Sequence, residues 1–241
     1  DRLFGDLTNK NIPYIPVGRL PIHNVHQLKT WIDKIQEYNE QKLFPLQNRL
    51  LCWYNNNELP GISKKFTNSI SDDMSIYILT TGNDSSKNIH IEQHAVFFLN
   101  QINFPYLITM IASHGSYKSI TPYRNHNNIT ITTEDIEHQR FIEPGGLMVF
   151  LSCDTGNFVQ PIKKGNSLAE ALFLQYRGPA GIISATEKTS PITNYFFAKS
   201  LLKQLHNNKF TIGDFLLSIQ KDISKISKKM ITTDQNVIFL K

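Results

Sequence analysis

The chain has 241 residues, of which 40% are hydrophobic, and its formal net charge is +5. This length fits one large α/β domain, and this hydrophobic fraction is enough to bury a core. The charge excess is far smaller than that of a nucleic-acid-binding tail, so we expect no nucleic-acid partner. No apolar run of about eighteen residues occurs, which predicts that the chain has no transmembrane segment.

The chain has two cysteines, Cys52 and Cys153. One pair cannot be the disulfide framework of a chain of this size, so we interpret both as free thiols, which leaves the cellular compartment open. The first residue is Asp1, and no signal peptide is visible. We therefore expect a processed product or a piece of a longer chain, whose targeting signal is out of view.

Short apolar runs alternate with segments of helical periodicity, which predicts a mainly parallel sheet flanked by helices. Strands are expected at 12–17, 50–54, 75–79, 106–112, 147–151 and 178–185. Helices are expected at 25–38, 89–99, 168–176, 191–205 and 211–226. The first of these helices is amphipathic, with apolar residues at Val25, Leu28, Ile32, Ile35 and Tyr38. Asn166 or Ser167 is expected to cap the helix at 168, and Asp214 follows Thr211 at capping-box spacing. Long loops are expected at 55–73 and 116–128.

Two of the predicted strands end in residues that can do chemistry. The strand at 106–112 is followed by Ser-His-Gly with His114, and the strand at 147–151 is followed by Ser-Cys-Asp-Thr-Gly with Cys153. Ligands bind beyond the carboxyl ends of open parallel sheets, so neighbouring strands would bring both side chains to one crevice. A thiol becomes a nucleophile beside a base, and imidazole is a base near neutral pH.

Acyl transfer also needs donors for the oxyanion that forms. The N–H groups of Gly115 and Cys153 are the candidates, and Gly156 is expected to let the loop turn tightly. Each signal alone has a plainer interpretation, because a His-Gly pair often marks a turn and a cysteine is often a buried apolar residue. Together they place a His before a Cys, which is also the order found in caspases.

Longer stretches resemble one family, the gingipain-like cysteine peptidases. Residues 1–7 and 12–21 resemble the region of that family that ends in a Gly-Arg strand. Residues 111–116 resemble its catalytic His-Gly-Ser segment, and residues 151–158 resemble its Cys-x-x-Gly-x-Phe nucleophile segment. Residues 168–172 and 178–186 are similar to the family's next segments along the chain. The resemblance is collinear from residue 1 to about residue 200.

The resemblance implies a caspase-like three-layer α/β sandwich, with residues 1–241 as a single catalytic domain that lacks the family's N-terminal strand-helix portion. It implies a cysteine endopeptidase that hydrolyses protein or peptide bonds through a thioester acyl-enzyme. Cys153 would be the nucleophile and His114 the general base, with Gly115 and Cys153 forming the oxyanion hole. A Glu contacts the catalytic His in the family, and at the matching place here Asn57 or Glu58 is expected to orient His114.

The resemblance further implies a protein or peptide substrate, no cofactor, and a secreted or exported enzyme, with a cytoplasmic one left open. The missing N-terminal portion would be a separate chain of the same precursor after processing, or would simply lie outside this sequence. Two alternatives stay open: a transpeptidase or sortase-like member of the family, and an inactive scaffold that binds peptides. Preference for Arg or Lys is not carried over, because residues 61–75 replace a longer stretch that supplies the family's acidic pocket. Asp72 and Asp73 are weak candidates for that role.

No metal site is predicted. Residues 6–11 resemble a calcium loop of relatives, but they hold Lys10 and few of the carboxylates that calcium needs. No other histidine pairs with a cysteine at metal-ligand spacing. Surface or capping roles are expected for His23, His26, His90, His94, His126 and His138. Cys52 is expected in the core, and a solvated helix face is expected for Lys221, Lys225, Lys228 and Lys229.

Overall fold

The structure is a computed structural model, which describes residues 17–40, 49–55, 75–81, 91–123, 129–158, 165–205 and 211–227. Its elements in chain order are α2 (Val25–Glu40), β1 (Arg49–Asn55), β2 (Ser75–Thr81), α4 (Ile91–Ile102), β3 (Ile108–Ala112), β4 (His114–Ser116), β5 (Ser119–Tyr123), β6 (Ile129–Thr132), α5 (Thr133–Glu137), β7 (Leu147–Leu151), α6 (Leu168–Leu174), β8 (Gly181–Ile183), α7 (Pro191–Leu205) and α8 (Ile212–Ser227). Among these helices none is long and apolar enough to cross a membrane.

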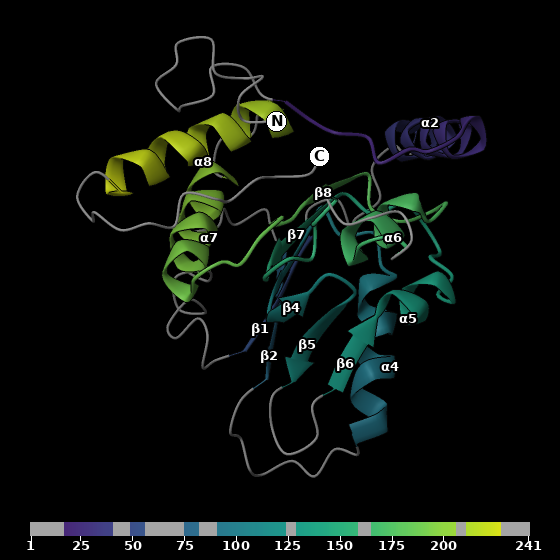
Figure 1. Cartoon of the computed structure of the whole chain (residues 1–241), viewed down its shortest axis with the longest axis horizontal. Helices are drawn as coiled ribbons and strands as arrows, with labels where there is room; N and C mark the ends of the chain where they lie inside the picture. Colours follow the sequence, from purple (N-terminus) through teal and green to yellow (C-terminus); the bar gives the residue numbers. More distant parts are fainter. Residues whose placement is uncertain are drawn as a thin grey trace.

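The main sheet has five strands in the order β2-β1-β3-β7-β8, and every neighbouring pair is parallel. Parallel neighbours require long crossover connections, and helices fill that role here. Helices α7 and α8 cover one face of the sheet, and α4, α5 and α6 lie on the other (Figure 1). The predicted parallel sheet between two helical layers is confirmed.

Strands β3 and β7 form the centre of this sheet and are buried along their whole length. Alternate side chains pack on opposite faces. Met110 packs with residues of α7 and α8, whereas its neighbour Ile111 packs with residues of α4 and α6. Burial on both faces explains why these strands are continuous apolar runs in the sequence.

A second sheet of three antiparallel strands, β4-β5-β6, follows β3 directly. The prediction of a long loop at 116–128 is therefore wrong for Ser119–Tyr123, which is strand β5. Two isoleucines explain why this segment is a strand and not a loop. Ile120 and Ile131 pair across the sheet and bury their side chains almost completely. Helix α5, which was not predicted, extends from β6 through a capping box between Thr132 and Asp135.

The later elements agree with the predicted ones apart from their ends. Helices at 191–205 and near 211–226 are confirmed, whereas α6 ends at Leu174 and β8 is only Gly181–Ile183. Ser167 is the cap of α6, since its side chain accepts from the N–H of Glu170. Thr211 likewise accepts from the N–H of Asp214 at 3.1 Å. The strand expected at 12–17 lies outside the described residues except for Val17, which is not in a strand.

Helix α2 does not bury the apolar face that its sequence pattern predicts. Val25 is 81% exposed and Ile32 is 41% exposed, whereas Lys34 is only 1% exposed. The ammonium group of Lys34 donates to the carbonyl of Phe173, and to that of Gln175 at 3.3 Å, at the carboxyl end of α6. These carbonyls have no partner inside their own helix, so a buried cation can bind there. The predicted face is thus turned to solvent at Val25 and Ile32, whereas Ile35 and Tyr38 are half-buried.

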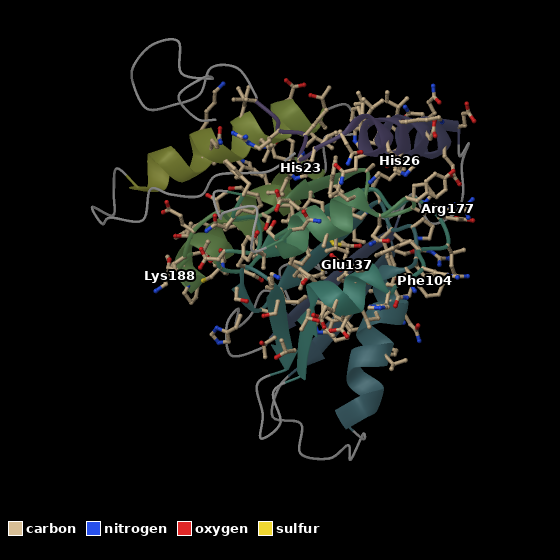
Figure 2. All side chains as sticks on the ribbon, turned by 45° about the vertical axis from the view of Figure 1, so that its right-hand side comes forward. His23, His26, Phe104, Glu137, Arg177 and Lys188 are labelled. Atoms are coloured by element: carbon tan, nitrogen blue, oxygen red, sulfur yellow. The ribbon has the colours of Figure 1, made fainter. Side chains whose placement is uncertain are left out.

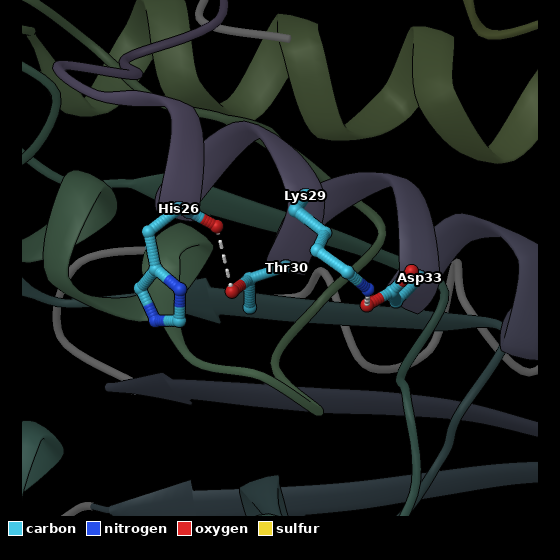
Figure 3. A network of polar contacts seen from close by, with 4 residues as sticks. All are labelled: His26, Lys29, Thr30 and Asp33. Atoms are coloured by element: carbon cyan, nitrogen blue, oxygen red, sulfur yellow. Dashed lines mark hydrogen bonds and ion pairs between the residues drawn. The ribbon is translucent and has the colours of Figure 1, made fainter.

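A polar face of α2 lies at the surface (Figure 3). Lys29 pairs with Asp33 at 2.6 Å, and the hydroxyl of Thr30 donates to the carbonyl of His26 at 3.0 Å. The hydrogen bond and the charge of Asp33 raise the pKa of Lys29. Both lysines thus sit on one helix with opposite surroundings, Lys29 exposed and Lys34 buried.

Candidate active site

The two segments that carry the predicted catalytic pair leave adjacent strands at the same edge of the sheet. Strands β3 and β7 are hydrogen-bonded in parallel, with Ala112 opposite Leu151 as the last pair. One residue further, the hydroxyls of Ser113 and Ser152 lie 3.2 Å apart, and both side chains are buried. His114 and Cys153 come next along the chain, so the topology brings the two predicted residues to the same edge of the sheet.

Gly115 packs directly against the nucleophile segment. A β-carbon added to Gly115 would lie 2.6 Å from the carbonyl oxygen of Cys153 and 2.8 Å from the β-carbon of Ser152. Such distances exclude any side chain unless one of the two segments moves. The glycine after His114 is therefore required by the close approach of two backbones, a reason that does not depend on its predicted role as an oxyanion donor.

The loop after Cys153 is held by the segment that follows β8. The N–H of Asp154 donates to the carbonyl of Glu187 at 3.1 Å, and the N–H of Gly156 donates to that of Ala185 at 2.9 Å. Asp154 has a positive φ of 55°, a conformation that Asp tolerates better than most residues. The chain turns again directly after Asp154, where the N–H of Asn157 donates to the Asp154 carbonyl at 3.1 Å across Thr155 and Gly156. Gly156 therefore lies in a turn, as predicted, and its N–H is used inside the protein.

Both cysteines are free thiols, and their surroundings differ. Cys52 lies in β1 and is 2% exposed, which confirms its predicted place in the core. Burial raises the pKa of the Cys52 thiol, which keeps it protonated and unreactive. Cys153 is half-buried, and His114 is exposed. Cys153 is thus the thiol that a solute can reach.

The groups that contact the Cys153 sulfur are not evident from the sequence. The N–H of Thr189 donates to Sγ at 3.3 Å, and the Thr189 hydroxyl oxygen lies 3.7 Å from Sγ. The thiol in turn can donate to the Thr189 carbonyl at 3.6 Å. Asn194, in the first turns of α7, donates through Nδ2 to the Leu151 carbonyl at 3.1 Å and to the Thr189 hydroxyl at 3.2 Å.

Thr189 and Asn194 could have been found from the order of the strands in the sheet, although no sequence motif marks them. Strand β8 lies next to β7, so the connection from β8 to α7 has to pass the carboxyl end of β7. Residues at that place line the crevice of an open parallel sheet. In the same connection Lys188 is exposed and projects from the surface (Figure 2).

Several predicted residues lie outside the described ranges: Asn57, Glu58, Asp72, Asp73 and residues 6–11. Strand β1 leads towards the first two, and its Tyr54 is paired with Ala112 of β3. Within the described ranges, no three His, Cys, Asp or Glu residues gather as a metal site would require. Exposed positions of His23 and His26 are confirmed, and His138 caps α5 as expected of a capping histidine.

A cavity of about 280 Å³ lies elsewhere, at the amino ends of β7 and β8. Leu147 and Gly181, the first residues of these strands, line it together with Trp31 of α2. Because His114 and Cys153 follow the carboxyl ends of their strands, this cavity is at the opposite end of the sheet from them.

Comparisons with solved structures find proteins of similar fold. The crystal structure of the Arg-specific cysteine proteinase gingipain R has 17% sequence identity and a TM-score of 0.69, with 98% of this chain and 56% of that chain covered. The complex of the pro- and mature domains of Porphyromonas gingivalis RgpB has 15% identity and a TM-score of 0.72, with 98% and 57% covered. A further structure, described as a protease, has 13% identity and a TM-score of 0.58, with 83% and 42% covered.

These likenesses confirm the caspase-like fold, and this chain spans slightly more than half the length of the gingipain chains. No curated protein matches at a significant level. The model of peptidase family C25 matches residues 1–240, and the chain therefore belongs to this family, the gingipain family.

Proposed function

We propose that the chain is a cysteine endopeptidase that hydrolyses peptide bonds of protein or peptide substrates. The observation that carries the proposal is the reachable thiol of Cys153 just past the end of β7, next to strand β3, which His114 follows in the chain. A thiol and an imidazole at adjacent strand ends can act together as nucleophile and base. Membership of family C25 supports the same chemistry.

In this mechanism His114 takes the proton of the Cys153 thiol, and the sulfur attacks the carbonyl carbon of the scissile peptide bond. The tetrahedral intermediate breaks its C–N bond, and the leaving amine takes the proton from His114. This leaves a thioester on Cys153. Water then gives a proton to His114 and attacks the thioester, which releases the carboxylate product and returns the proton to sulfur.

The oxyanion would be held by the N–H groups of Gly115 and Cys153. The Cys153 N–H has no hydrogen-bond partner among the described residues, whereas those of Asp154 and Gly156 both do. In the hairpin of β4 and β5, Ser116 pairs with Ser119 across a two-residue turn, and Gly115 pairs with Ile120. Hydrogen-bonded and non-bonded pairs alternate in antiparallel sheets. If the turn closes on Ser116 and Ser119, the Gly115 N–H points away from β5.

Two further groups belong to the proposal. Asn57 or Glu58 would orient His114, because β1 pairs with β3 and its Tyr54 lies opposite Ala112, two residues before His114. A separate N-terminal portion of the same precursor would contact the chain, as pro- and mature domains do in the RgpB complex. The same family likeness supports an exported enzyme.

Cleavage of a mixed peptide library, read by mass spectrometry, tests the proposal. The chain is compared with Cys153→Ala and His114→Ala, and with Cys52→Ala as a matched control that removes the buried thiol. We expect new peptide ends from the chain and from Cys52→Ala, and none above background from the other two variants. The residues before the cut sites would give the specificity.

Two results would overturn the proposal. Equal cleavage by the chain and by folded Cys153→Ala would assign the activity to a contaminant. No cleavage by a folded chain, also after its N-terminal precursor portion is added, would favour the peptide-binding scaffold. Ligated products that need an added amine and replace the hydrolysed ones would instead indicate a transpeptidase.

A further inference from the structure

The surroundings of the Cys153 sulfur carry a further assignment, which rests on the proposed nucleophilic role of that residue. We propose that Thr189 and Asn194 are positioning residues that hold Cys153 ready for attack. Thr189 donates its N–H and its hydroxyl to the sulfur, and Asn194 fixes the direction of that hydroxyl. The two residues come from the connection between β8 and α7 and from the first turns of α7.

The orientation of the Asn194 amide is set by its two partners. The Leu151 carbonyl can only accept a hydrogen bond, so the atom 3.1 Å from it is the amide nitrogen. The second hydrogen of this nitrogen is directed to the Thr189 hydroxyl oxygen at 3.2 Å. That oxygen is therefore an acceptor towards Asn194, and its own hydrogen is left to point elsewhere.

The Cys153 sulfur is the acceptor that the Thr189 hydroxyl then faces, at 3.7 Å, in addition to the Thr189 N–H at 3.3 Å. Donors stabilise a thiolate more than a thiol, because hydrogen bonds to charged groups are the stronger ones. The neutral thiol has a different partner, the Thr189 carbonyl at 3.6 Å. One residue can thus serve both protonation states of the nucleophile.

Hydrogen bonds hold Asn194 both to the end of β7 and within the beginning of α7. Asn194 is attached to the end of β7 through the Leu151 carbonyl, two residues before Cys153. Its own N–H donates to the Ser190 carbonyl at 3.0 Å. Ser190 also accepts from the N–H of Thr193 at 3.2 Å. The beginning of α7 is therefore fixed to the end of β7 and to Thr189, which contacts the sulfur.

The test measures alkylation of Cys153 by iodoacetamide as a function of pH, read on the Cys153 peptide by mass spectrometry. In Thr189→Val, which keeps the shape and removes the hydroxyl, the midpoint of the pH profile is expected to rise by about one pH unit. Thr189→Ser should restore the profile. Thr193→Val is the matched control, because its hydroxyl pairs with Ser190 at 2.9 Å. It should leave the midpoint unchanged.

The variant Asn194→Leu tests whether Asn194 acts on Cys153 through the Thr189 hydroxyl or only supports the local structure. Alone, it should raise the midpoint in the same direction as Thr189→Val. In the Thr189→Val background it should add no further shift, because the hydroxyl that it orients is gone. The titratable groups nearby, His114, Asp154, Glu187 and Lys188, are the same in all these variants. They therefore cannot produce a difference between them.

An unchanged midpoint in folded Thr189→Val, or additive shifts in the double variant, would overturn the assignment. Alkylation does not require peptide cleavage, so the two proposals fail separately. A shifted midpoint without any peptidase activity would keep the positioning role and remove the proposed function. Peptide cleavage together with an unchanged midpoint in Thr189→Val would keep the proposed function and remove the positioning role.

Discussion

Gly115 leaves no room between its α-carbon and the backbone carbonyl of Cys153, since a β-carbon there would meet that oxygen at 2.6 Å. The residue after the predicted base thus packs against the backbone of Cys153 and the side chains of Ser152 and Thr155. This contact links the position of the His114 segment to that of the Cys153 segment. A single methyl group added at Gly115 would therefore displace the His114 segment relative to the Cys153 segment.

The first prediction concerns Gly115→Ala. The added methyl group has to push the Cys153 segment or the start of the hairpin outwards, and a displacement of about 1 Å can reduce catalysis by about 100-fold. We expect a loss of this order in kcat/KM, together with a lower free energy of unfolding.

Gly145→Ala is the matched control, because its β-carbon would meet only the α-carbon of Pro179, at 3.9 Å. Activity measured on one peptide substrate and chemical denaturation compare the two variants. A Gly115→Ala enzyme as active and as stable as Gly145→Ala would show that the close contact does not constrain the site.

The second prediction concerns the buried hydroxyl pair of Ser113 and Ser152, 3.2 Å apart. Ser152→Ala leaves Ser113 with its other acceptor, the His114 carbonyl at 3.1 Å. We therefore expect a loss of only about 1 kcal/mol in the free energy of unfolding. A double-mutant cycle with Ser113→Ala, followed by urea denaturation, should show the two effects to be non-additive. Fully additive effects would mean that the hydroxyls do not interact.

The strands at the centre of the sheet were predictable because burial on both faces leaves an unmistakable apolar run, and β3 and β7 are such runs. The place of His114 and Cys153 just past the carboxyl ends of these strands was also predictable, and their catalytic roles stay predictions. Strand β5 was missed because its sequence, Ser-Ile-Thr-Pro-Tyr, contains a single aliphatic residue, Ile120, and so shows no apolar run. Thr189 and Asn194 were missed because only the pairing of β7 with β8 brings them to the sulfur.

Helix α2 shows the reverse case, in which a clear pattern gives the wrong buried face. The spacing of Val25, Leu28 and Ile32 predicts burial, but hydrophobic periodicity does not include a lysine that can bind carbonyls at the end of another helix. Lys34 supplies that interaction and lies over the Phe173 ring at 4.6 Å. A local pattern is thus overruled by one tertiary contact.

The third prediction separates Asn57 from Glu58 as the group that orients His114. An orienting acceptor holds the imidazole in its productive direction, so its removal should reduce kcat/KM by at least about 10-fold. We expect this loss in either Glu58→Gln or Asn57→Leu, with the other variant near the activity of the unchanged chain. Peptide hydrolysis across pH measures both. If both variants keep full activity, neither residue orients His114.

The fourth prediction concerns the pH dependence of stability that Lys34 imposes. Burial lowers the pKa of Lys34 from 10.5 to about 7. Between these two pH values the unfolded chain therefore binds more protons at this residue than the folded chain does. The contribution of Lys34 to the free energy of unfolding should rise as the pH increases from about 7 towards 10, and it is least favourable below pH 7. Lys34→Met should remove this rise.

Lys29→Met is the matched control on the same helix, since Lys29 is exposed and its pKa is raised by Asp33. Other charges near Lys34 are Glu37 and Arg177, which pair with each other at 3.1 Å, and Tyr38, whose pKa is raised by burial. These groups are unchanged in both variants. Urea denaturation at several pH values between 6 and 9.5 should give a flatter profile for Lys34→Met than for Lys29→Met. Parallel profiles would show that the Lys34 ammonium stays charged against the Phe173 and Gln175 carbonyls.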